Sequence, residues 1–146
     1  MNACGKVIWT VPHRTHHSVF QGDDGSFWVA DHNWRYEIID NYIHPKPTFI
    51  DEAVLQVSPD GKILRDLSIL NSIYSSGYGG IFSDVSKDYG LTHMNDVEIL
   101  SVDMADSFPM FEAGDILVSL RNLSVVMVLD GKTGLIKWHL HHPLLR

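Results

Sequence analysis

The sequence contains a single cysteine, and this scarcity limits the chemistry open to the chain. Cys4 is alone among 146 residues, so no disulfide can form within the chain and no zinc site can be built from several cysteines. The N-terminus lacks the apolar core of a signal peptide, and no apolar run reaches the roughly 18 residues that a membrane span needs. The sequence therefore predicts neither a signal peptide nor a transmembrane segment, and it leaves the compartment open.

Basic residues are also scarce. The chain has 11 Lys and Arg against 18 Asp and Glu, which gives a formal net charge of −7 at pH 7. Nucleic acids and anionic membranes attract basic surfaces, so we expect neither as a partner. Histidine is the exception to this plain composition, because nine histidines are many for a chain of this length. Most of them are expected at the surface or in turns.

Helical periodicity is nearly absent, and short apolar runs separated by turn signals fill most of the chain. Asp-Gly turn signals occur at 23–25, 58–62 and 130–134, each before a run typical of a β-strand. The predicted strands fall into two groups, 17–20, 26–31, 53–57 and 63–69, then 96–102, 115–122, 125–129 and 135–140.

Both groups contain four strands joined by similar turns, which indicates an internal repeat. Four-stranded sheets repeated around an axis are typical of a β-propeller. The sequence therefore predicts an all-β, partial β-propeller of about two four-stranded antiparallel blades in a single domain, 1–146. The blades are expected at approximately 16–70 and 93–140, with an inter-blade insertion at 71–92 whose loosest part is the Ser- and Gly-rich segment 75–80.

Residues 5–9 echo residues 134–138, so the chain is expected to begin with a strand of a preceding blade. A closed propeller needs at least about four blades. Two blades and one extra strand therefore predict an incomplete propeller, either an excerpt of a longer one or a fragmentary gene product. Blade faces that lack a neighbour would stay uncovered, and self-association through these faces is expected.

The residues that could carry chemistry lie near the ends of predicted strands. His16 and His17 precede the strand at 26–31, and His93 precedes the strand at 96–102. The strand at 115–122 delivers Arg121 near its end. A histidine and an arginine at strand ends could meet at one mouth of the β-structure. The Asp-x-x-Thr-Gly-x-x-x-Trp segment that closes the repeat is expected to be structural.

This combination resembles the arylsulfotransferase family, six-bladed propeller enzymes that use no nucleotide sulfate donor. The resemblance covers roughly residues 5–146 and is closest over 93–138. It implies that a histidine takes the sulfuryl group from a phenolic sulfate ester and passes it to a second phenol. Aryl sulfates and phenols are the small-molecule partners that it implies, without a cofactor.

Three residues match the family's site by position. Arg121 corresponds to the sulfate-binding arginine, His93 to the histidine that opens its blade, and His17 to the equivalent histidine of the earlier blade. The chemistry agrees with this assignment, because a planar guanidinium can hold two sulfate oxygens and a histidine can protonate a leaving phenolate. His93, Arg121 and His17 are therefore the predicted catalytic residues.

The sequence differs from the family at the nucleophilic histidine. In the family it follows the Trp-ended strand, in a segment that opens the next blade. His17 lies eight residues after Trp9, so the matching histidine after Trp138 is expected at or just beyond Arg146. The pair at 141–142 lies where the family has connecting residues. We therefore expect the chain alone to lack the nucleophile and to be inactive.

Other interpretations remain open at the level of sequence. Arg121 could pair with a neighbouring acid, and His93 could be a structural residue bonded to a loop carbonyl. Asn95 and Asp96 are expected to brace the loop, and the His-rich tail at 139–142 is expected to hold no true metal site. The alternative function is a non-catalytic propeller module for interaction or scaffolding. A quinoprotein-like propeller would explain the Thr-Gly-x-x-x-Trp segment but neither His93 nor Arg121.

Overall fold

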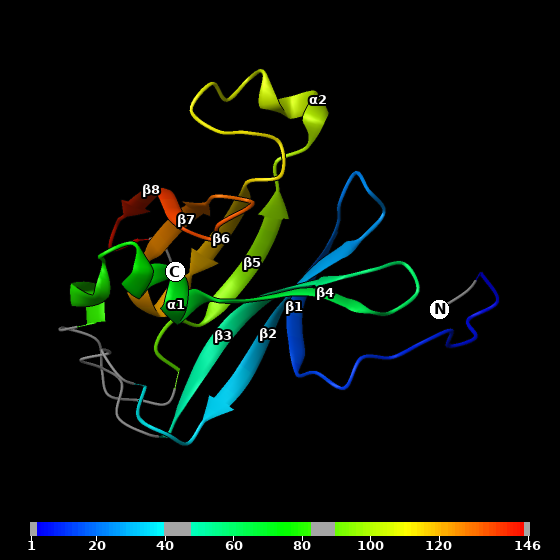
Figure 1. Ribbon diagram of the computed structural model, residues 1–146, viewed down its shortest axis with the longest axis horizontal. Helices are drawn as coiled ribbons and strands as arrows, with labels where there is room; N and C mark the ends of the chain where they lie inside the picture. The colour runs from blue at the N-terminus through cyan, green and yellow to red at the C-terminus, as the bar shows by residue number, and fades with distance from the viewer. Residues whose placement is uncertain (1–2, 40–47, 83–89, 145–146) are drawn as a thin grey trace.

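The computed structural model describes residues 3–39, 48–82 and 90–144, which form two antiparallel sheets of four strands each (Figure 1). The strands of each sheet lie side by side in chain order. The predicted all-β class and the two four-stranded units are therefore confirmed, as blades of a propeller that is not closed. The first sheet contains β1 (Thr15–Gln21), β2 (Phe27–Arg35), β3 (Phe49–Val57) and β4 (Ile63–Ser68), and the second contains β5 (Met94–Ile99), β6 (Ile116–Leu120), β7 (Val125–Leu129) and β8 (Ile136–His141).

The strands follow from a period-two burial pattern. In β6, Ile116, Val118 and Leu120 are buried, whereas Leu117 between them is exposed. Successive side chains of a strand point to opposite faces of its sheet, so this alternation turns one face of the second sheet toward the core. β3 differs, because seven of its nine residues are buried and both of its faces are therefore covered.

One apolar core joins the two sheets. Trp28 and Val54 from the first sheet belong to the same buried cluster as Met94 and Val118 from the second. Along this boundary β5 packs against β1 and β2. The first strands of the two sheets are thus neighbours, as expected for the inner strands of adjacent blades.

A helix occupies the start of the predicted insertion. In α1 (Ile69–Ser75) the Ser68 hydroxyl caps the N-terminus by accepting the Asn71 N–H at 3.0 Å. Ile69 and Ile73 are buried, so this part of the insertion is anchored in the core. The 3₁₀ turn η1 (Gly79–Phe82) follows, and the rest of the insertion up to residue 89 lies outside the described residues. No helix of the described ranges combines the length and apolarity required to cross a membrane.

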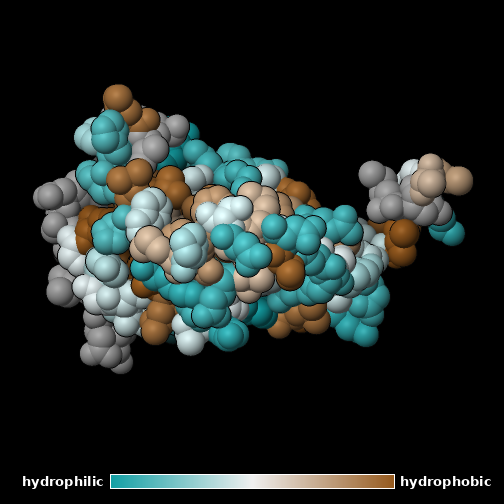
Figure 2. Space-filling model, turned by 90° about the horizontal axis from the view of Figure 1, so that it is seen from above, coloured by the Kyte–Doolittle hydropathy of each residue, from teal (hydrophilic) through white to brown (hydrophobic). Residues whose placement is uncertain are grey.

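The predicted N-terminal strand is not formed. Residues 5–11 pair with no sheet, and the residues before Trp9 extend away from the body of the molecule (Figures 1 and 2). Trp9 and Val11 instead pack on Val29 and Leu55, on the outer face of the first sheet. The Trp9 indole N–H also donates to the Pro59 carbonyl at 2.9 Å. Covering an apolar face removes more apolar surface from water than an isolated edge strand could, which explains the difference.

The connection predicted between 31 and 53 is shorter than expected. β2 continues to Arg35 and β3 begins at Phe49, and the two strands form nine consecutive residue pairs. Their outer halves contain Trp, Ile and Phe among polar residues, and such a mixed stretch becomes regular only when its partner strand is in place. Residues 40–47 lie outside the described residues. The short helix α2 (Val102–Ala105) lies in the connection between β5 and β6.

Candidate functional site

His17 and His93 share an uncommon backbone conformation. Their φ angles are 59° and 50°, in the left-handed region that residues other than glycine seldom adopt. His17 lies where the pairing of β1 with β2 shifts register, between His16 and Val19. His93 immediately precedes β5, whose pairing with β6 shifts register after Met94. The same local irregularity therefore presents one histidine at the start of each inner strand.

Four imidazole rings form a cluster across the two sheets. The ring centroids of His17 and His93 are 5.5 Å apart, and those of His16 and His17 are 4.8 Å apart. His32, on β2, is 5.2 Å from His16. Such a cluster resists carrying several protons at once, because protonated rings repel one another.

The pKa values of two rings reflect this crowding. Burial lowers the pKa of His93 most, and the positive charges of Arg121 and His17 lower it further. Burial is also the main cause that lowers the pKa of His16, with His17 and His32 adding repulsion. Both rings are therefore held toward the neutral form in the absence of an anion, and an anion placed among them would favour their protonation.

Arg121 lies in the turn after β6, close enough to His93 for its charge to act on the His93 ring. It begins the 3₁₀ turn η2 (Arg121–Leu123), and its backbone N–H donates to the His93 carbonyl at 2.9 Å. The Asn122 N–H donates to the Thr92 carbonyl at 3.0 Å, so the two segments are bonded twice. The Arg121 side chain is exposed, and among the described residues it forms no ion pair with an acid. The structure thus brings Arg121, His93 and His17 to one region, while their chemical roles stay predictions.

Acidic residues brace the cluster. The Ser18 hydroxyl donates to Asp96, a hydrogen bond that ties β1 to β5 directly beside the two histidines. Asp96 also accepts the Val97 N–H at 3.0 Å. Buried Asp31 pairs with His13, with Nδ1 and Oδ2 2.8 Å apart, and its other oxygen has no partner among the described residues.

Sequence reasoning missed part of this cluster. The sequence places His16 near a strand end but assigns no specific role to His13, His16 or His32, and it places Asp31 only at the end of a strand. The available signal was the pair Asp31 and His32, an acid and a histidine that follow the apolar residues 27–30. This pair indicates a site only once β2 is known to pair with β1, because that pairing places Thr15 opposite Asp31. His44, the remaining histidine without a specific case, lies outside the described residues.

The C-terminal histidines lie elsewhere. His139 and His141 are on β8, the edge strand of the second sheet, and the His139 ring packs on Tyr78 at 4.8 Å. The His142 N–H donates to the Ser124 carbonyl at 3.0 Å. Across the described ranges no three His, Cys, Asp or Glu side chains are grouped so that they could hold a metal ion.

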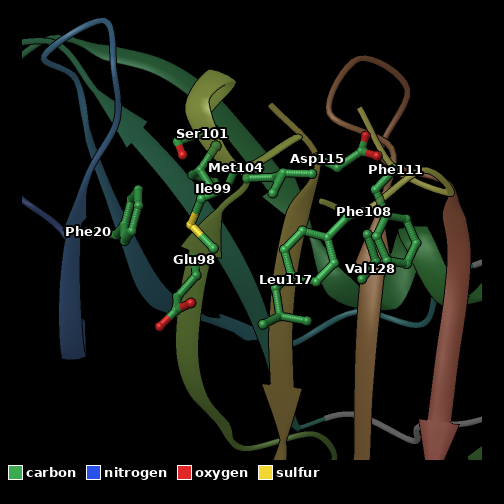
Figure 3. A pocket seen from close by; sticks show the side chains of 11 residues that line it. Phe20, Glu98, Ile99, Ser101, Met104, Phe108, Phe111, Asp115, Leu117 and Val128 are labelled. Atoms are coloured by element: carbon green, nitrogen blue, oxygen red, sulfur yellow. The ribbon is translucent and has the colours of Figure 1, made fainter. Parts of the chain in front are cut away.

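An apolar cavity lies at the opposite end of the inner strands (Figure 3). Phe20 from β1 faces it across the boundary between the sheets, and Met104, Phe108 and Phe111 come from the connection after β5. Ile99, also on its wall, is six residues beyond His93, which corresponds to roughly 20 Å of strand. The cavity is therefore separate from the histidine cluster and contributes no titratable group to it.

An incomplete propeller that gathers histidines and one exposed arginine at the start of its inner strands is suited to bind a small anion. Residues 1–143 match the family model described as arylsulfotransferase (ASST). The chain belongs to the arylsulfotransferase family. Searches of curated proteins and of solved structures found no match.

Proposed function

We propose that Arg121, His93 and His17 form a sulfate-ester site, and that the parent reaction is sulfuryl transfer from an aryl sulfate to a phenol through a sulfohistidine. The observation that supports the proposal most is the approach of His17 and His93, which come from different sheets and lie 5.5 Å apart between ring centroids. Family membership supplies the reaction class.

The chemistry of the three side chains suits this reaction. The Arg121 guanidinium stays charged and can donate two parallel hydrogen bonds to sulfate oxygens. His93 is held toward the neutral form by burial and by Arg121. A bound sulfate ester would shift that balance toward the protonated ring, which could then donate a proton to the departing phenolate. In this proposal the three residues bind the sulfate ester and assist the departing phenolate, and none of the three is assigned as the histidine that accepts the sulfuryl group.

Calorimetric titration with 4-nitrophenyl sulfate tests the proposal. We expect R121A to weaken binding by about tenfold or more, because a hydrogen bond to a charged group contributes about 1.5–3 kcal/mol. K62A is the matched control, since Lys62 is an exposed cation in the turn before β4 and pairs only with Asp60 among the described residues. Equal affinities of R121A and K62A, or no binding by the unaltered chain, would contradict the proposal.

A second candidate function is an interaction module without catalysis. The second sheet and its flanking connection expose several apolar side chains, Met104, Phe108, Met110, Leu117 and Leu140. Exposed apolar groups of this kind favour association with another protein surface. The outer face of the first sheet is already covered by Trp9, so a second copy of the chain would bind at the second sheet.

A further inference from the structure

Glu52 is a buried acid that the proposed chemistry does not use. It lies on β3, with His32 opposite it on β2, and only 4% of its surface is exposed. Its carboxylate accepts the backbone N–H of Met94 from the other sheet. Buried carboxylates are seldom retained without a partner, and the partner here is the residue directly after His93.

Both peptide units that flank His93 are hydrogen-bonded. In the unit before it, the Thr92 carbonyl accepts the Asn122 N–H at 3.0 Å. In the unit after it, the His93 carbonyl accepts the Arg121 N–H at 2.9 Å and the Met94 N–H donates to Glu52. Between these bonds His93 has a φ of 50°, a conformation that costs free energy for a residue with a Cβ. Such a conformation persists only where the surroundings enforce it, and these three hydrogen bonds do so by holding the peptide units on both sides of His93.

We infer that Glu52 is a positioning residue: by accepting the Met94 N–H it holds the peptide unit after His93. Together with the bonds from Arg121 and Asn122, this contact enforces the left-handed conformation of His93 and so keeps the His93 ring beside His17. The sulfate-ester role of this arrangement rests on the proposed function. The contact itself does not, because it joins β3 to β5 whatever the site binds.

The groups around Glu52 indicate that hydrogen-bond acceptance, rather than charge, is what His93 requires. Asp51 is next to Glu52, but Arg35 at 2.8 Å and the Ser68 hydroxyl at 2.8 Å hold its carboxylate. Burial raises the pKa of Glu52 to about 7, opposed by the bond from Met94 and assisted by the charge of Asp51. Either protonation state offers an oxygen to the Met94 N–H, so glutamine should replace glutamate here.

NMR of the full chain tests the inference with three variants. E52L removes the acceptor, E52Q keeps it, and E98Q alters an exposed glutamate on β5 as a matched control. The measured quantities are hydrogen exchange of the Met94 amide, the ring shifts of His93, and the affinity for 4-nitrophenyl sulfate. We expect E52L to lose Met94 protection, to shift the His93 ring and to bind about tenfold more weakly, with E52Q and E98Q close to the unaltered chain.

If E52L does not fold, the pH dependence of the Met94 amide chemical shift tests whether Glu52 accepts the Met94 N–H. In the unaltered chain this shift should follow two groups, Glu52 and His93, and in E52Q only His93. Unchanged Met94 protection in E52L, or the same two-step titration in E52Q, would overturn the inference. If E52L changes Met94 and His93 while no form of the chain binds 4-nitrophenyl sulfate, the positioning role stands and the sulfate-ester proposal fails.

Discussion

At the scale of single residues, the site is governed by burial of groups that can titrate. His93 and His16 both lose affinity for a proton mainly through burial, and their neighbours add repulsion. The pKa of Glu52 is raised, not lowered, for the same reason: burial disfavours the charged form, which is the deprotonated one for a carboxyl and the protonated one for an imidazole. A small region between the sheets thus contains two imidazoles with lowered pKa values, His93 and His16, and a carboxyl whose pKa is raised to about 7.

This state of Glu52 has a measurable effect on stability. Its pKa rises from 4.5 in the unfolded chain to about 7 in the folded one, so the folded state binds more protons between these values. Folding stability from Glu52 is therefore fully present below pH 4.5 and is lost as the pH rises through 7. At 1.36 kcal/mol per unit the loss is on the order of 3 kcal/mol.

Urea unfolding at pH 5 and pH 8 measures this pH-dependent contribution of Glu52 to the free energy of unfolding. E52Q does not ionise, so its free energy of unfolding should fall less between the two pH values than that of the unaltered chain, by on the order of 2–3 kcal/mol. E98Q, at an exposed position of β5, should follow the unaltered chain. If the free energy of unfolding of E52Q and of the unaltered chain changed equally between the two pH values, the pKa of Glu52 would not be raised by folding.

Single residues were only partly predictable from the sequence. His17, His93 and Arg121 could be named because they lie near the ends of predicted strands and match the arylsulfotransferase site by position. Glu52 could not, since its role depends on pairing β3 with β2 and then packing β5 against the result. Long-range contacts of this kind leave no local pattern.

At the scale of elements, the regular parts were predictable and the irregular ones were not. The apolar and β-branched run of β6 and the Asp-Gly turn before β8 are local signals, and both elements are found where they were expected. The Asp130 carboxylate accepts the Thr133 N–H at 2.7 Å and the Lys132 N–H at 3.0 Å. The Thr133 hydroxyl also donates to it at 2.9 Å, and these three bonds are the main causes that lower the pKa of Asp130 to about 2.

The misassigned N-terminal segment shows the limit of element-level reasoning. Residues 5–9 do resemble residues 134–138, yet only the second segment forms part of a strand, β8. The two segments have different surroundings. β8 pairs with β7, whereas Trp9 packs on the apolar outer face of the first sheet and donates a hydrogen bond to the Pro59 carbonyl. Sequence similarity between repeats therefore predicts a strand only where a partner edge is available.

At the scale of the whole molecule, the two blades present unequal outer faces. The face of the first sheet is covered by Trp9 and Val11, and the second sheet keeps Leu117 and Leu140 exposed. If the chain acts as an interaction module, sedimentation velocity should show concentration-dependent association. Substituting lysine for Leu117 should abolish that association without unfolding the chain, because the side chain is exposed. A single monomeric species at all concentrations would contradict this second candidate.

The proposed sulfate-ester site takes His17 from the first sheet, and His93 and Arg121 from the segments that flank β5 and β6 of the second. NMR titration with 4-nitrophenyl sulfate, following the ring signals of His17 and His93, tests it most directly. We expect the signals of both rings to shift with the same dissociation constant and His93 to gain a proton on binding, and we expect R121A to weaken both responses together. Rings that respond with different dissociation constants, or that do not respond while the chain remains folded, would contradict a shared sulfate-ester site.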